Sequence, residues 1–187
     1  ITIRPDGLDE AVEAKTLPKW EHMEISTLLS RIREFGVEGM GGAQFPTAAK
    51  LQAALEENRS DYKLLIINGC ECEPMVTCDD RLIQENVEDI LLGIKILKKI
   101  LNPSEVIFAV EDNKTFAIDT LKSALEQHRQ NLGEHLASLR VLPSKYPQGA
   151  ARNLIRALTG IEVPYKVHTA ELGIVVHNVS TVYAIKQ

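Results

Sequence analysis

The chain has 187 residues, of which 44% are hydrophobic and 25% charged, and its formal net charge is -5. A chain of this size is typical of one domain with one main core, and this composition excludes a disordered or fibrous protein. The negative charge disfavours nucleic-acid binding, because basic groups that neutralise phosphates supply most of that affinity. We therefore expect a folded domain with no nucleic acid as partner.

Apolar runs in the sequence are too short to cross a membrane. The longest surround residues 64–67 and 174–176, whereas a membrane-spanning helix needs about 20 apolar residues. We therefore expect a soluble chain with no direct membrane span. The chain begins at Ile1 without a signal-like segment, which favours a segment of a longer protein.

The first predicted helix follows an irregular N-terminal segment. Residues 1–24 mix proline, glycine and acidic residues, which predicts a short strand followed by a linker, or the end of a preceding domain. The helix is expected next, with Ser26 and Thr27 as candidate caps and Gly36 at its end. Its predicted buried face consists of Leu28, Leu29, Ile32 and Phe35.

A glycine-rich loop over residues 36–42 leads into a predicted helix over residues 48–57. A loop followed by a helix presents free backbone N–H groups to an anion. Residues 62–68 then form a compact apolar run, which predicts a strand buried on both faces. This strand is expected to end in a turn at Asn68 and Gly69.

The rest of the chain alternates helices with strands. Asp79 and Asp80 begin a long helix that runs to about Ile100. The further expected elements are a strand at 106–110, a helix at 114–129, a strand at 139–142, a helix at 149–158, a strand at 173–176 and a terminal helix entered through His177 and Asn178.

This alternation predicts an α/β fold with a Rossmann-like, mostly parallel sheet covered by helices. In such folds, ligands collect at the carboxyl ends of the strands. The segments after Asn68, Leu142 and Val176 are therefore expected to lie near one another.

The glycine loop on its own is a weak signal of a binding site. It follows a predicted helix rather than a strand, unlike the dinucleotide fingerprint, and it lacks the Gly-Lys-Ser/Thr ending of a P-loop. The glycine count favours a structural turn. Glycine also allows a flat ligand to lie against the backbone.

The three cysteines Cys70, Cys72 and Cys78 lie close together in the sequence. Their odd number is a poor basis for disulfides and favours a reducing cytoplasm. An iron–sulfur site normally needs four thiolates, and no fourth cysteine or nearby histidine completes this set. We therefore predict no metal site and expect these side chains to act as small buried apolar groups.

As a whole string, residues 36–50 resemble the flavin loop of the NADH-oxidising subunit of respiratory complex I, which has the core Gly-Gly-Ala-Gly-Phe-Pro-Thr-x-x-Lys. Further segments agree in order: 68–74 (Asn-Gly-Cys-Glu-Cys-Glu-Pro), 145–149 (Lys-Tyr-Pro-Gln-Gly) and 176–181 (Val-His-Asn-Val-Ser-Thr). They are especially similar to the C subunit of the Rnf-type electron-transfer complexes. The resemblance covers roughly residues 25–187 and implies one FMN- and NADH-binding domain there.

The resemblance implies that FMN lies against the glycine loop. Gly39, Gly41 and Gly42 would contact the flavin through the backbone. Lys50 would supply a cation for the flavin or the nicotinamide nucleotide, and Phe45 would stack on NADH. From the residues alone, Phe45 could equally pack in the core, and Lys50 could be a solvated helix lysine.

Loops after the strands would complete the implied site. Asn68 would hydrogen-bond the flavin, and Glu73 would lie near NADH. The loop from Tyr146 to Gly149 would close over the flavin. The FMN phosphate would be held by His177, Asn178 and Thr181. An exposed acidic turn at Glu73 and ordinary helix capping are the alternatives from the residues alone.

The sequence departs from the family pattern at a few positions. Gln44 stands where the family has a small residue, which is expected to narrow the space for the nucleotide. Ala150 and Ala151 stand where complex I relatives carry paired glutamates.

The function implied is an electron-entry domain of a membrane-associated, ion-translocating oxidoreductase complex. NADH would reduce FMN, with no catalytic side chain required, because hydride transfer is the chemistry of the cofactor. Electrons would pass to [4Fe-4S] clusters outside this chain. The implied partners are NADH and the other subunits, with the domain peripheral at the cytoplasmic face of the inner (cell) membrane. A flavin-dependent cobalamin reductase and a non-catalytic docking domain of the same fold are the alternatives.

Overall fold

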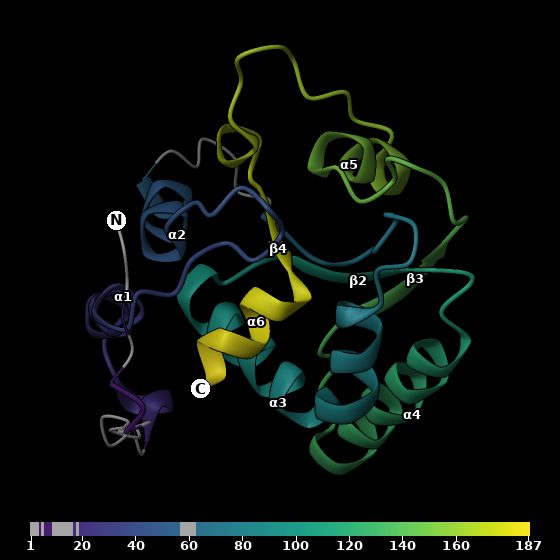
Figure 1. The fold of residues 1–187 in the computed structure, drawn as a ribbon. Helices are drawn as coiled ribbons and strands as arrows, with labels where there is room; N and C mark the ends of the chain where they lie inside the picture. Colours follow the sequence, from purple (N-terminus) through teal and green to yellow (C-terminus); the bar gives the residue numbers. More distant parts are fainter. Residues whose placement is uncertain (1–3, 5, 9–16, 18, 57–62) are drawn as a thin grey trace.

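A four-stranded parallel sheet forms the centre of the protein (Figure 1). The computed structural model describes residues 4, 6–8, 17, 19–56 and 63–187. Each pair of neighbouring strands is parallel, which confirms the predicted α/β fold. In the spatial order β3-β2-β1-β4, the strands are β3 (Ser138–Leu142), β2 (Glu105–Glu111), β1 (Leu64–Gly69) and β4 (Ile174–Asn178).

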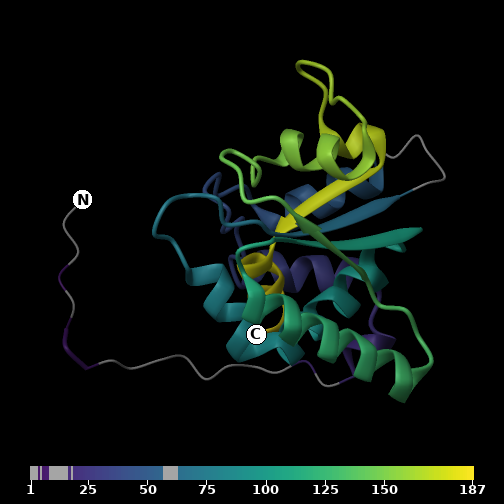
Figure 2. The same ribbon diagram turned by 90° about the vertical axis from the view of Figure 1, so that its right-hand side faces the viewer.

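Helices cover the two faces of the sheet unequally, as Figure 2 shows from the side. One face carries α3 (Cys78–Leu101), α4 (Thr115–Leu132) and α6 (Val179–Lys186). The opposite face is covered by α5 (Ala151–Thr159). Helices α1 (Ile25–Glu34) and α2 (Thr47–Glu56) add to the core of the first face. A 3-10 helix, η2 (Thr169–Leu172), precedes β4.

Alternating side chains of β1 separate two cores. Leu65 and Ile67 face the larger core, which α3, α4 and α6 cover, whereas Leu64 and Ile66 face the smaller core beneath α5. All four side chains are at most 2% exposed. The apolar run therefore forms a strand without a solvent face, as the sequence predicts.

The first helix starts earlier than predicted. It begins at Ile25, so Ser26 and Thr27 lie inside its first turn, and Glu24 occupies the cap position without a side-chain cap hydrogen bond. The exposed first turn can leave its N–H groups to water. The N-terminal end of α1 therefore forms without a side-chain cap.

The end of the first helix agrees with the prediction except for one side chain. Gly36 ends the helix with a left-handed φ of 64°, which glycine adopts without steric cost. Phe35 is 56% exposed and lies outside the buried face. That face consists of Leu28, Leu29 and Ile32.

Strand β1 continues through the predicted turn. Gly69 still pairs with Val110 of β2, and a Cβ at Gly69 would lie 3.1 Å from the Ala109 carbonyl oxygen. Glycine at this position therefore allows two backbones to approach closely rather than reversing the chain.

The strand predicted near the N-terminus falls mostly on residues outside the described ones. In the described part of that segment, Trp20–His22 form the 3-10 helix η1, and Trp20 and Met23 pack against the larger core. No helix in the described ranges has the length and apolarity needed to cross a membrane.

Gly93 lets α3 and α6 pack at close range, and its replacement tests that contact. A Cβ at Gly93 would overlap the backbone carbonyl of Val182. Alanine stabilises an isolated helix by about 1 kcal/mol over glycine, but overpacking here is expected to reverse that sign. We predict that Gly93→Ala lowers the free energy of unfolding by about 1–3 kcal/mol in urea denaturation. The exposed Glu88→Ala on the same helix is the control, and equal effects of the two changes would contradict the prediction.

Candidate functional site

The carboxyl ends of β1 and β4 lie side by side and bring distant loops together. Their register pairs Ile67 with His177 and Asn68 with Asn178. A cavity of about 280 Å³ opens at this edge of the sheet. The residues that line it are Gly39, Gly41, Ala43, Phe45, Thr47, Lys50, Asn68, Gly149, Ala150, Ala151, Val176, His177, Asn178 and Thr181. The structure therefore places the glycine loop and the predicted strand ends around one space.

The glycine loop is closed at its base by backbone hydrogen bonds. The Gly39 N–H donates to the Phe45 carbonyl at 2.9 Å, and the Thr47 N–H donates to the Val37 carbonyl at 3.0 Å. The loop also contacts the far end of the chain, because the Met40 N–H donates to Thr181 Oγ1 at 2.9 Å. These bonds hold the loop as one wall of the cavity.

Asn68 fastens a second loop to the cavity. Its Nδ2 donates to the Gly149 carbonyl at 2.9 Å, and its Oδ1 accepts the Cys70 N–H at 3.0 Å. A Cβ at Gly149 would lie only 2.5 Å from the Cys70 carbonyl oxygen. Because no real Cβ fits at that distance, the loop that precedes α5 reaches the cavity only with glycine at 149.

The third wall is the start of α6. Asn178 is its N-cap and accepts the Ser180 N–H through Oδ1 at 2.9 Å. A Cβ at Gly41 would lie 3.3 Å from the Asn178 Cβ, so the glycine loop packs directly against the cap. The first turn of a helix carries free N–H groups and a partial positive charge, which together suit an anion.

Lys50 and His177 determine the charge of the cavity. Burial lowers the pKa of Lys50 from its ordinary 10.5 to about 8, and its Nζ donates to the Val176 carbonyl. Burial and the neighbouring Lys50 hold the pKa of His177 well below 6.5. At neutral pH, His177 is therefore an uncharged imidazole, and Lys50 is the cationic side chain of the lining.

Two buried polar atoms at the cavity lack partners within the described residues. They are Thr47 Oγ1 and His177 Nε2, on side chains that are 0% and 3% exposed. A buried polar group without a partner costs about 1–3 kcal/mol. A ligand with donors and acceptors on a flat ring would satisfy such groups.

A second cavity of about 400 Å³ adjoins the first and shares Phe45 and Lys50 with it. Its other lining residues are Ala53, His168, Thr169 and Ala170. No described aspartate or glutamate lines either cavity, in a chain with 26 acidic and 21 basic residues. The two spaces together therefore suit anionic, partly aromatic ligands.

Gly42, Glu73 and Tyr146 do not line the cavity, although the sequence places them in the site. Gly42 and Glu73 are exposed. Tyr146 is 69% exposed and lines a separate open groove with Lys145. Sequence reasoning missed Thr47 and Ala43 as lining residues. Both residues lie within the glycine-loop motif, and this position could have indicated that they line the site. The glycines of the motif were selected instead.

Gln44 does not narrow the cavity, so that expectation is wrong. Its side chain is exposed and absent from the lining, and its backbone has a left-handed φ of 50°. Glycine is favoured at such a position because the left-handed region is costly for residues that carry a Cβ. The constraint at position 44 therefore concerns the backbone, not ligand space.

The cysteines differ from one another. Cys70 is buried, and burial, Glu111 and Cys72 raise the pKa of its thiol to about 12. Cys72 is half-buried, and Cys78 is exposed, so the expectation of buried apolar side chains is wrong for Cys78. No group of His, Cys, Asp and Glu within the described ranges could hold a metal ion.

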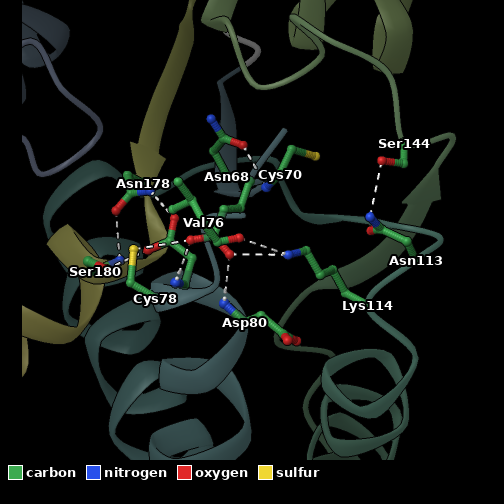
Figure 3. Close-up of polar contacts among 12 residues, drawn as sticks. Asn68, Cys70, Val76, Cys78, Asp80, Asn113, Lys114, Ser144, Asn178 and Ser180 are labelled. Carbon is green, nitrogen blue, oxygen red and sulfur yellow. Dashed lines mark hydrogen bonds and ion pairs between the residues drawn. The ribbon is translucent and has the colours of Figure 1, made fainter. Parts of the chain in front are cut away.

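Glu71 anchors the start of α3, the region where Figure 3 shows Cys78, Asp80 and Lys114. It accepts the Asp79 N–H at 3.0 Å and the Cys78 thiol at 3.1 Å, and it pairs with Lys114 at 3.2 Å. Burial alone would raise the pKa of Glu71, but these hydrogen bonds and the Lys114 charge outweigh it and hold the pKa below 4.5. The carboxylate therefore stays charged next to the site.

A parallel sheet with a cavity at the carboxyl ends of its strands is typical of α/β domains that bind nucleotides. The chain belongs to the family of Nuo51 FMN-binding domains, whose family model matches residues 32–187.

Relatives of known kind share this domain. The chain is 44% identical over 187 residues to the C subunit of the ion-translocating oxidoreductase complex of Haemophilus influenzae (strain 86-028NP), covering 100% of this chain and 27% of that protein. The corresponding protein of Pectobacterium atrosepticum is 43% identical, with 100% and 26% covered. The chain thus spans about a quarter of the length of these curated relatives. A crystal structure of an NAD+-reducing [NiFe]-hydrogenase matches with a TM-score of 0.75 and 26% identity, over 89% of this chain and 31% of that one.

The buried pair of Glu71 and Lys114 is expected to stabilise the fold in a pH-dependent way. We predict that Glu71→Gln lowers the free energy of unfolding by about 3 kcal/mol at neutral pH, because it leaves Lys114 buried without its partner. The folded pKa of Glu71 is depressed, so its contribution is present above about pH 4.5 and is lost as the pH falls through the lower folded value. Urea denaturation as a function of pH measures both effects.

The exposed pair of Arg81 and Glu85 provides the control for that measurement. Glu85→Gln should change stability by less than about 1 kcal/mol, since surface ion pairs contribute little. A Glu71→Gln effect that persists undiminished at acid pH would show that the carboxylate charge is not the cause.

Proposed function

We propose that this chain is the electron-entry domain of an ion-translocating oxidoreductase complex of the Rnf type. It binds FMN in the cavity at the carboxyl ends of β1 and β4, with NADH in the adjoining space. The observation that carries the proposal is the convergence of three distant loops on one cavity, in a chain of the FMN-binding family. Buried polar atoms at this cavity lack partners among the residues that the structure describes.

The residues present fit FMN. Gly39, Gly41 and Gly149 line the cavity and offer backbone without side chains to the ring. A Cβ at each would meet other protein atoms within 3.5 Å, so these glycines also let the walls of the cavity pack closely. Thr47 and His177 offer buried polar atoms without partners, and the first turn of α6 offers N–H groups to the phosphate. Each feature is complementary to a different part of one phosphorylated ring system.

Each wall of the cavity has a task in this proposal. Asn68 holds the loop that precedes α5 through Gly149, and the second N–H of its side-chain amide is the one that donates to the flavin. Lys50 supplies positive charge where the two cavities join, and Phe45 offers an exposed ring to the nicotinamide nucleotide. FMN held by these residues would supply the chemistry that accepts a hydride from NADH and passes electrons on singly.

The wider role rests on the relatives. They are named as the C subunits of ion-translocating oxidoreductase complexes, and the similar hydrogenase is NAD+-reducing. We infer that residues 25–187 form the FMN and NADH unit, because α1 already packs into the main core. Electrons pass onward to [4Fe-4S] clusters outside this chain. The domain works with the other subunits as a peripheral part at the cytoplasmic face of the membrane.

Flavin binding tests the proposal. We expect FMN fluorescence to be quenched saturably by the 187-residue chain, and Lys50→Met to weaken binding by about 10- to 100-fold, the value of a charge-assisted hydrogen bond. The exposed Lys122→Met is the matched control and should bind as the wild type does. Addition of NADH without oxygen should then bleach the absorbance of the bound flavin. A docking domain that does not bind flavin would show no such bleaching.

The pKa of Lys50 predicts how FMN affinity depends on pH in the same experiment. Because burial lowers that pKa to about 8, the positive charge is present below this pH and is lost above it. FMN affinity should therefore fall as the pH rises through about 8 in the wild type. It should stay constant in Lys50→Arg, whose guanidinium does not deprotonate. No saturable quenching at high micromolar FMN would refute the proposed function.

A further inference from the structure

Asp79 joins the N-terminal ends of two helices from outside the cavity. It is the second residue of α3, is 7% exposed and does not line the cavity. Its Oδ2 accepts Asn178 Nδ2 at 2.6 Å, and its Oδ1 accepts Ser180 Oγ at 2.6 Å. Figure 3 shows Asn178 and Ser180 beside the first turn of α3. One carboxylate therefore holds both the cap and the first turn of α6.

These bonds fix the orientation of the Asn178 amide. The Nδ2 side faces the carboxylate of Asp79, and the Oδ1 side accepts the Ser180 N–H. A flipped amide would point its oxygen at the carboxylate and lose both bonds. The capping geometry of α6 is thus determined by a residue 99 positions earlier in the chain.

The fixed segment is also the one that forms the cavity wall. Asn178 and Thr181 line the cavity, Gly41 packs on Asn178, and Met40 bonds to Thr181. A displacement of the first turn of α6 would move these contacts together. The side of the cavity formed by the first α6 turn is the side that suits a phosphate.

We propose that Asp79 is a positioning residue for phosphate recognition. It holds Asn178 and Ser180 so that the free N–H groups of the first α6 turn and Thr181 face the phosphate of a bound flavin nucleotide. The inference rests on the proposed function, because it names the residue that prepares one part of the same site. It predicts that Asp79 affects the phosphorylated flavin far more than riboflavin, which has the ring without the phosphate.

The test compares FMN and riboflavin on variants of the 187-residue chain by fluorescence quenching. Asp79→Ala should weaken FMN binding at least about tenfold and riboflavin binding less than about twofold, since a charged-group hydrogen bond is worth about 1.5–3 kcal/mol. Asp79→Asn should restore FMN binding to within about threefold of the wild type. Its amide oxygen can accept from Asn178, and its NH2 can donate to the Ser180 hydroxyl. Ser180→Ala, which removes one of the two bonds, should give an intermediate loss.

Asp89→Asn is the matched control. Asp89 also lies on α3 and holds α6, but it pairs with Lys186 at the opposite end of that helix, at 3.0 Å. Loss of a general α3–α6 contact would change both flavins alike in both variants. A merely structural role of Asp79 would not weaken FMN binding alone, and would not do so in Asp79→Ala alone.

The outcomes separate this inference from the proposed function. If the wild type binds neither FMN nor riboflavin, the proposed function fails and this inference fails with it. If the wild type binds FMN but Asp79→Ala keeps the wild-type ratio of FMN to riboflavin affinity, the inference alone is overturned. Should Asp79→Ala not fold, Ser180→Ala decides the matter: a ratio of FMN to riboflavin affinity unchanged from the wild type overturns the inference.

Discussion

The parallel pairing of β1 with β4 is the constraint on which the rest of the structure depends. Asn68 lies opposite Asn178 in that register, so a loop that follows the first strand meets the helix that follows the last. A slip of one residue would turn every side chain of β4 to the other face of the sheet. His177 would then point away from the cavity, where its buried Nε2 now has no partner in the described part of the chain.

Two buried acids hold this edge together without entering the cavity. Glu71 binds the start of α3, and Asp79 binds the start of α6. Burial raises the pKa of Asp79, against the hydrogen bonds from Ser180 and Asn178, whereas Glu71 is held charged by Lys114 and its other donors. The carboxylates of Glu71 and Asp79 thus bind helix ends, and no described carboxylate lines the cavity.

The sequence predicted the features that depend on local pattern. The apolar run of β1 and the alternation of strands with helices were enough for the fold and for the meeting of the segments that follow Asn68 and Val176. The glycine loop entered the predicted site only through the resemblance to a known family. Features that depend on distant contacts could not be read in this way. Gln44 differs from expectation because of its backbone conformation, and the groove that the side chain of Tyr146 lines has no signal in the local sequence. In the sequence, Asp79 is recognisable only as an acidic residue at the start of a helix. Its partners Asn178 and Ser180 lie about 100 residues later in the chain, so the local pattern could not reveal them.

A crystal structure of the chain grown with FMN would test the central claim most directly. The account predicts the phosphate at the first turn of α6 near Thr181, with the ring between the glycine loop and Asn68. Lys50 should lie at the junction of the two cavities with the bound flavin beside it. FMN bound instead in the groove of Lys145, Tyr146 and Arg156 would contradict the account, because none of the converging loop contacts would then serve the ligand.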